Sequence, residues 1–119
     1  MAESLTLEKS KDFAIRIIKL YRYLCNEKHE YILSKQLMRS GTAIGANLTE
    51  ALYGFSRKDF LAKISISLKE CAETRYWLEL LHKTDYLSDS EYNSIYHDCT
   101  ELIKLLSSTI ITTRQNGTE

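Results

Sequence analysis

Apolar residues recur at spacings of three and four along most of this chain, which is the pattern of amphipathic helices. Four stretches carry the pattern and predict helices at residues 8–26, 32–53, 57–82 and 89–111. In the first stretch the apolar positions are Phe13, Ala14, Ile17, Ile18, Tyr21 and Leu24. In the last stretch they are Tyr92, Ile95, Tyr96, Cys99, Leu102, Ile103, Leu106 and Ile110.

Capping signals lie between the predicted helices. Gly54 predicts a left-handed end to the second helix. Ser56, with Asp59 three residues later, predicts the N-cap of the third helix, and Ser88 with Glu91 forms a capping box before the fourth. Each signal falls where the apolar periodicity breaks, so the boundaries of the predicted helices rest on two kinds of evidence.

Composition favours the same architecture. The 119 residues include no Pro and only four Gly, which suits long uninterrupted helices. The polar segment 26–30 and the other connections are short, and short connections oblige successive helices to lie side by side. The sequence therefore predicts one all-α domain over residues 1–119, an antiparallel up-down four-helix bundle.

The second predicted helix is unusually rich in small residues. Along the run QLMRSGTAIGANLTEA, residues 36–51, one face carries the apolar and small positions. Gly41 and Gly45 lie four residues apart without the Lys and Ser or Thr of a phosphate loop, so they indicate close packing of helices. The positions that share the buried face are Leu33, Leu37, Ser40, Ile44, Leu48 and Ala51.

The third predicted helix has two apolar faces. One is a core face, and the other, with Ile66, Trp77 and Leu80 beside Glu70 and Glu73, lies roughly opposite. A bundle helix on its own needs only one such face, and exposed aromatic and aliphatic residues are typical of contacts between chains. The pattern predicts a homo-oligomer. The alternative is that Trp77 only covers one end of the bundle core. The core face comprises Phe60, Leu61, Ile64, Leu68, Cys71, Ala72 and Leu78.

Charged and polar residues on the two central helices form a candidate network at this oligomer contact. Arg39 offers a rigid fork of donors that a carboxylate accepts in bidentate fashion. The alternative is a set of solvated surface charges, each contributing at most about 1 kcal/mol. The candidate residues are Arg39, Asn47, Glu50, Glu70, Glu73, Arg75 and Trp77.

Charge and cysteine content limit the function classes. Sixteen basic and sixteen acidic residues balance, so overall charge gives no reason to expect strong binding to nucleic acid or anionic membranes. No apolar run is long enough for a signal peptide or a membrane span, and we expect a cytoplasmic protein. Cys25, Cys71 and Cys99 are widely spaced, which is typical of buried free thiols.

Catalytic and metal sites find little support. Glu79 and His82 match half of a di-iron Glu-x-x-His pattern, but no other His follows a Glu at that spacing. His97 and Cys99 are two residues apart on a helix and point in different directions, which argues against a nucleophile and base pair. We expect no enzyme activity, no cofactor and no metal.

The run of residues 36–51, followed by ISLKECAETRYWLELL at residues 66–81, resembles the prokaryotic four helix bundle protein family. That family includes the 23S rRNA intervening-sequence proteins, and the accessory variability protein of diversity-generating retroelements is a related branch. The first and last helices match only in pattern. The resemblance implies ring-like homopentamers. The residues that carry it are Gln36, Leu37, Arg39, Ile44, Asn47, Glu50, Ser67, Leu68, Glu70 and Glu73.

Two functional hypotheses follow. The leading one is a non-enzymatic scaffold that works through contacts with itself and with other proteins. The alternative is an accessory protein that binds RNA or DNA through a basic rim of the ring. The rim residues are Lys35, Arg39, Arg57, Lys58 and Lys63. Because the retroelement branch is strongly basic and this chain is neutral, the first hypothesis is preferred.

Overall fold

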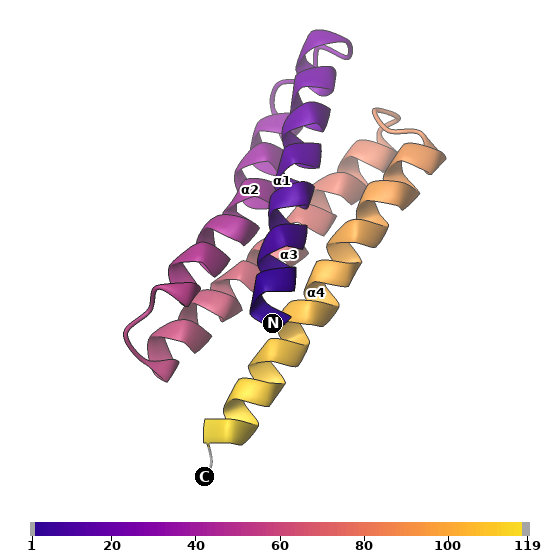
Figure 1. Cartoon of the computed structure of the whole chain (residues 1–119). Coiled ribbons are helices and arrows are strands. Elements are labelled where there is room, and N and C mark those ends of the chain that lie inside the picture. Colours follow the sequence, from indigo (N-terminus) through magenta and orange to yellow (C-terminus); the bar gives the residue numbers. More distant parts are fainter. Residues whose placement is uncertain (1, 118–119) are drawn as a thin grey trace.

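The computed structural model describes residues 2–117, which form four helices that run alternately in opposite directions (Figure 1). They are α1 (Ala2–Asn26), α2 (Leu33–Leu52), α3 (Arg57–Lys83) and α4 (Asp89–Gly117). The molecule is elongated, with extents of 52 × 22 × 20 Å. Within the described residues, no helix is both long and apolar enough to cross a membrane. The predicted all-α architecture of four helices is confirmed.

Two helices are longer than predicted. α1 begins at Ala2 rather than at Glu8, and in the added turns Thr6 is buried, a polar residue that the apolar pattern does not count. α4 continues to Gly117 rather than ending at residue 111 and extends past the rest of the bundle (Figure 1).

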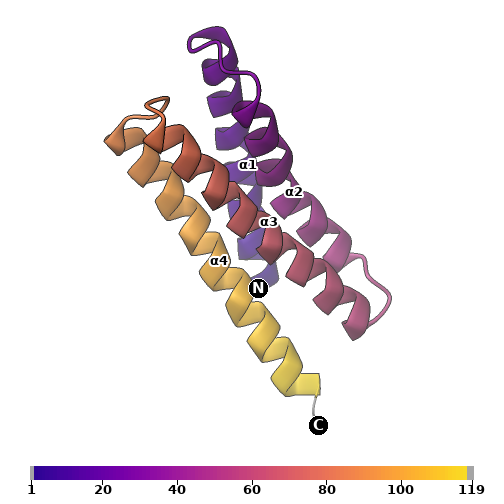
Figure 2. The same cartoon turned by 180° about the vertical axis from the view of Figure 1, so that it is seen from behind.

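α3 is the helix on which α2 and α4 both pack, and α1 packs mainly on α2. Seen from behind, α3 lies in front of the bundle with α2 and α4 on its two sides (Figure 2). The fully buried side chains come from all four helices and form one continuous core. Its largest members are Ile17, Leu24, Leu37, Ile44, Leu48, Ile64, Leu78, Leu81, Leu102 and Leu106.

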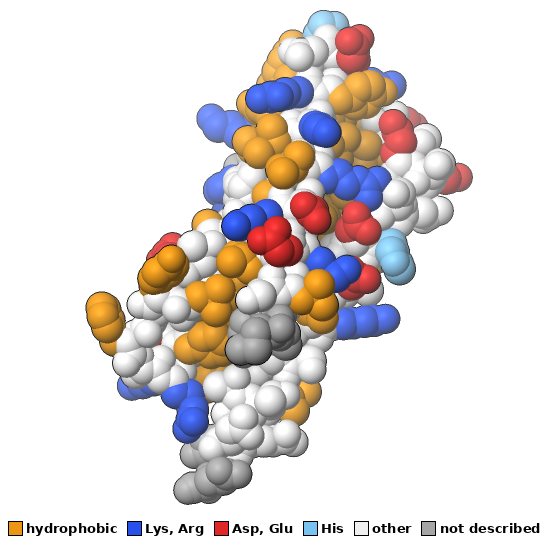
Figure 3. Space-filling model, in the orientation of Figure 1, with side chains coloured by type: hydrophobic (Ala, Val, Ile, Leu, Met, Phe, Trp, Pro, Cys, Tyr) orange, Lys and Arg blue, Asp and Glu red, His pale blue; other side chains and the backbone are white. Residues whose placement is uncertain are grey.

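Ion pairs bridge α1 and α4, which have the least extensive contact of the helix pairs that pack against each other. Lys9 Nζ lies 2.8 Å from Glu101 Oε1, and Arg16 Nη1 lies 2.7 Å from Asp98 Oδ2. Acidic and basic side chains accordingly alternate where α1 faces α4 (Figure 3). Because these pairs are largely exposed, they add little stability and mainly align the two helices.

The small residues of α2 allow α1 to approach closely, as the sequence predicts. A Cβ atom on Gly41 would lie 2.8 Å from Cγ1 of Ile17, whose side chain is fully buried. A Cβ atom on Gly45 would lie 3.0 Å from Ser10 Oγ. The two glycines therefore face α1; a Cβ atom on Gly41 would collide with the core residue Ile17, whereas one on Gly45 would crowd only the small side chain of Ser10.

Buried hydroxyl groups join α2 to α3. Ser67 Oγ donates a 2.7 Å hydrogen bond to the main-chain carbonyl of Ile44, and the hydroxyls of Thr74 and Ser40 lie 2.9 Å apart. All three hydroxyl-bearing side chains are fully buried. Ser67 and Thr74 are thus core residues of α3, although the apolar pattern does not assign them to its core face. The predicted core residue Ala72 is instead exposed.

Side-chain caps begin three of the helices. Glu30, which is buried, accepts hydrogen bonds from the main-chain N–H groups of Leu33 and Ser34 at 3.0 and 2.7 Å, a cap that sequence analysis missed. Ser56 Oγ accepts from the Asp59 N–H at 3.1 Å, as predicted. These bonds satisfy donors that a helix N-terminus otherwise leaves free.

The capping box before α4 is also confirmed. Glu91 Oε1 accepts a 2.8 Å hydrogen bond from the Ser88 N–H, and Ser88 Oγ accepts a 3.1 Å bond from the Glu91 N–H. These hydrogen bonds with Ser88 lower the pKa of the Glu91 carboxyl below its ordinary value.

Gly54 does not end α2 in the predicted left-handed conformation, since no described glycine has a positive φ. The N–H of Gly54 instead donates a 3.1 Å bond to the carbonyl of Ala51, which tightens the last turn of α2. A Cβ atom on Gly54 would lie 3.1 Å from the carbonyl oxygen of Ala51 and 3.3 Å from Cβ of Asp59, so a larger residue would crowd both the end of α2 and the start of α3.

Gly41→Ala should destabilise the bundle, because the new methyl group collides with a core side chain that has no room to move. Overpacking costs about 1–3 kcal/mol, and the better helix propensity of Ala returns only about 1 kcal/mol. Gly45→Ala is the matched control, since its neighbour Ser10 is small and the propensity gain offsets the contact. Urea denaturation at one protein concentration tests this. Equal midpoints for the two variants would show that α1 and α2 are not held at the described distance.

Glu91→Gln should cost stability at neutral pH but less in acid. Because the folded-state pKa of Glu91 is lowered, its contribution is present above the ordinary pKa of about 4.3 and is lost as the pH falls through the folded value. The difference in melting temperature between wild type and variant should therefore shrink from pH 6 to pH 3. The exposed Glu27→Gln is the control. A difference that stays constant with pH would contradict the role of the charged carboxylate.

Candidate interaction surface

Arg39 of α2 lies at the centre of a polar cluster with α3. Its guanidinium is ion-paired with Glu73 and lies 3.5 Å from Glu70 Oε2. The indole Nε1–H of Trp77 donates a 2.9 Å hydrogen bond to Glu73 Oε2. Glu70, Glu73 and Trp77 follow one another at spacings of three and four, so a single side of α3 presents all of them to Arg39.

A second ion pair lies further along the same two helices. Lys63 Nζ of α3 is 2.8 Å from Glu50 Oε1 of α2. Ile66, three residues after Lys63 and four before Glu70, is positioned between the two ion-paired groups and keeps 40% of its surface exposed. We call this surface the α2–α3 outer face; it consists of Arg39, Ala43, Asn47, Glu50, Lys63, Ile66, Glu70, Glu73 and Trp77.

Besides Glu50, which pairs with Lys63, two of the candidate network residues do not join the Arg39 cluster. The side-chain amide of Asn47 donates a 2.9 Å bond to the carbonyl of Ala43 in its own helix. Arg75 points toward α4, where its guanidinium lies 5.2 Å from the ring centre of Tyr96. Its Nε is buried and forms no hydrogen bond within the part of the chain that the structure describes.

Trp77 is half-buried and packs against the bundle core, whereas the two-faced pattern places it on an exposed surface. Its indole contacts Tyr76 edge to face, with ring centres 5.0 Å apart, and the Tyr76 side chain remains 52% exposed. The large apolar groups that α3 presents to solvent are thus Ile66 and Tyr76. Apolar periodicity does not single out Tyr76, because it lies outside both faces of the predicted helix.

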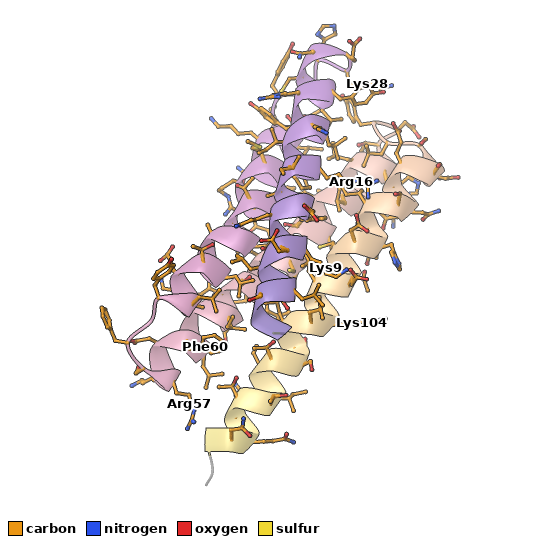
Figure 4. The ribbon with its side chains drawn as sticks, viewed as in Figure 1. Lys9, Arg16, Lys28, Arg57, Phe60 and Lys104 are labelled. Atoms are coloured by element: carbon orange, nitrogen blue, oxygen red, sulfur yellow. The ribbon has the colours of Figure 1, made fainter. Side chains whose placement is uncertain are left out.

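The five candidate rim cations do not lie together in the protomer. Lys35 is in the first turn of α2, about 25 Å along the helix from the α2–α3 connection where Arg57 and Lys58 lie. Arg39 is ion-paired with Glu73, and Lys63 is ion-paired with Glu50. Figure 4 shows Arg57 in the first turn of α3, at the end of the molecule where α2 and α3 join. Among the described residues, Arg57 and Lys58 form no ion pair.

The residues of the half di-iron pattern contact different groups. Glu79 accepts a 3.4 Å hydrogen bond from the Tyr96 hydroxyl. His82 Nε2 lies 2.6 Å from Asp89 Oδ1, and the imidazole stacks on Tyr92 with ring centres 4.2 Å apart. Within residues 2–117, no three His, Cys, Asp or Glu side chains are placed to share a metal ion.

The three cysteines are free thiols. Cys71 and Cys99 are buried, and Cys99 Sγ donates to the main-chain carbonyl of Cys71 at 3.4 Å, which links α4 to α3. The hydrogen bond with Cys99, together with burial, raises the pKa of the Cys71 thiol well above its ordinary value. A buried thiol held in its protonated form is a packing group rather than a nucleophile. Cys25 is half-buried.

Glu73→Gln should destabilise the protein more than Glu50→Gln. Glu73 accepts from both Arg39 and Trp77 in a partly desolvated position, so neutralising it should cost about 1 kcal/mol. The pair of Glu50 with Lys63 is more exposed, and its loss should cost less than about 0.5 kcal/mol. Urea midpoints at one protein concentration provide the comparison. The reverse order would show that the Arg39 cluster is a set of solvated surface charges.

Comparison with known proteins supports the resemblance found in the sequence. The family model of the 23S rRNA-intervening sequence protein matches residues 3–108. A crystal structure of a protein of unknown function from the S23 ribosomal protein family of Bacteroides thetaiotaomicron VPI-5482 is 51% identical. The alignment covers 92% of this chain and 98% of that one, with a TM-score of 0.92. A search of curated protein sequences found no match. The chain belongs to the 23S rRNA-intervening sequence protein family.

Proposed function

We propose that this protein is a non-enzymatic, homo-oligomeric scaffold whose copies associate through the α2–α3 outer face. The observation that carries the proposal is the position of Ile66, an exposed aliphatic side chain between two groups of ion-paired residues. An apolar centre with a polar surround is the usual arrangement of a protein–protein interface.

Small side chains make this face suitable for close approach. On the α2 side of the outer face, Ala43 belongs to the face and Ala46 is exposed next to it, so a neighbouring copy can come close to the backbone of α2. The charged groups on either side of Ile66 lie at fixed positions and can select a neighbouring surface with complementary charges.

The oligomer proposed is a ring of five copies, as the family resemblance implies. A ring requires a heterologous contact, in which the α2–α3 outer face of one copy packs against a different surface of the next. The exposed Tyr76, which lies beside Trp77 on α3, extends the apolar area available to such a neighbour. We further propose that the protein acts in the cytoplasm, where its three free thiols would stay reduced.

An accessory role in binding RNA or DNA is the second candidate function. It is supported by Arg57 and Lys58, which are exposed at one end of the bundle with no ion-paired carboxylate among the described residues. A ring would repeat this pair of cations around one rim, and repetition multiplies a weak contact. Lys35, Arg39 and Lys63 would contribute less, because of the distant position of Lys35 and the ion pairs of the other two.

Ile66→Glu should break the oligomer into smaller species, because a carboxylate would have to be buried without a partner at the centre of the contact. Ile15→Glu is the matched control: Ile15 is 52% exposed on α1, away from the α2–α3 outer face. Light scattering after size exclusion gives the mass of each variant, and helical circular dichroism checks the fold. An unchanged mass for Ile66→Glu, or equal loss in both variants, would refute the proposed interface.

A further inference from the structure

The α2–α3 connection exposes aromatic rings to an unusual degree. The Phe55 side chain is 100% exposed and that of Tyr53 is 81% exposed, although the connection between the two helices is only four residues long. Neither ring is part of the hydrophobic core or in contact with another aromatic ring of the described chain. Large apolar groups that a monomer leaves in water commonly mark a binding surface.

A shallow cleft of about 570 Å³ lies beside this connection. Its apolar walls are Ala51, Leu52, Gly54 and Phe60, and Figure 4 shows Phe60 one turn into α3 from Arg57. The hydroxyl-bearing residues Ser4, Ser56 and Thr113 complete the lining, together with Arg57. The cleft therefore combines an apolar surface with groups that can form hydrogen bonds and one positive charge.

Two cations lie next to the aromatic rings. Arg57 and Lys58 begin α3 and are exposed, and the nearest carboxylate on the same turn, Asp59, lies beyond ion-pair distance of both in the described structure. Asp59 moderates the positive potential, but one acidic residue leaves this end of the helix with a net positive charge. Adjacent positive charge and flat apolar rings suit an anionic partner that itself has flat apolar faces.

We propose that the α2–α3 connection binds single-stranded nucleic acid, with bases stacked on Phe55 and Tyr53, a base edge in the adjacent cleft, and phosphates paired with Arg57 and Lys58. This inference rests on the second candidate function and assigns its site. Stacking of bases on aromatic side chains beside a basic groove is a general mode of binding to single strands, and it is largely independent of sequence. A duplex would not fit, because its bases are already stacked on one another.

Charge and cleft chemistry disfavour two other occupants. If a second copy docked here by a two-fold axis, Arg57 and Lys58 of both copies would face each other, and like charges across an interface are costly. A membrane surface would use the exposed rings and the cations, but its acyl chains offer no hydrogen-bonding edge to the polar groups that line part of the cleft. A nucleobase presents both a ring face and hydrogen-bonding edges, so it matches all of these groups.

Fluorescence anisotropy with a labelled oligouridylate of about 12 nucleotides tests the site on the full-length protein. Phe55→Ala should weaken binding roughly 5- to 100-fold, the range expected when one base loses its stacking partner. Tyr31→Ala is the matched control, because Tyr31 is 58% exposed in the connection at the opposite end of the bundle. The Phe55 side chain makes no core contact, so its removal should leave the melting temperature unchanged.

Arg57→Ala and Lys58→Ala should each flatten the salt dependence, lowering the slope of log K against log salt by about 0.7 for each phosphate that is no longer neutralised. Lys28 is an exposed cation in the connection at the opposite end of the bundle, and Lys28→Ala should leave this slope unchanged. An abasic strand of the same length cannot stack on either ring, so wild type should bind it more weakly than Phe55→Ala binds the oligouridylate.

Each alternative outcome has a distinct meaning. If the cation variants weaken binding while Phe55→Ala matches Tyr31→Ala, nucleic-acid binding stands and the stacking site is refuted. No binding by wild type at about 100 µM would refute both the site and the second candidate function. Binding to anionic phosphatidylserine vesicles alone would overturn the proposal and assign the surface to membranes.

Discussion

The close approach of α2 to both of its neighbours is the constraint on which the rest of this structure depends. Gly41 and Gly45 leave space for Ile17 and Ser10 of α1, while Ser40 and Ile44 meet hydroxyl groups of α3. A helix that packs this tightly on two sides has little freedom to rotate or slide. The positions of all its outward side chains, Arg39 and Glu50 included, are fixed as a consequence.

That constraint explains how a neutral, compact chain can present a defined surface. Because α2 and α3 are held by buried hydrogen bonds, Arg39 reaches Glu73 and Glu50 reaches Lys63 across the same seam, with Ile66 between them. The α1–α4 seam is different, since exposed ion pairs of Lys9 and Arg16 align it without close interdigitation. The rigid half of the bundle thus carries the proposed interface, and the end where α2 turns into α3 carries the proposed nucleic-acid site.

Sequence analysis could predict the helices and most caps, because apolar periodicity and capping residues are local signals. The first turns of α1, where the buried residue is Thr6, were not predicted, and neither was the cap by Glu30, which requires a carboxylate to fold back over the next helix. Gly54 shows a further limit: a glycine can be favoured by close neighbours, here the Ala51 carbonyl and Asp59, rather than by a left-handed φ.

The contacts of the candidate network were only partly predictable, because helical spacing does not fix how side chains and connections are oriented in the folded bundle. Helical spacing places Arg39, Glu70, Glu73 and Trp77 on facing sides, and the structure brings them together. Spacing could not show that Arg75 turns toward Tyr96, which depends on how α3 is rotated within the bundle, or that Phe55 is left wholly in solvent, which depends on the path of the α2–α3 connection. The central claim is that this fold is one unit of a larger assembly, and the most direct test is the solution mass of the wild-type protein by multi-angle light scattering. The account predicts a defined multiple of the 13.8 kDa chain mass at micromolar concentration, near fivefold for the proposed ring, and a mass equal to a single chain would contradict it.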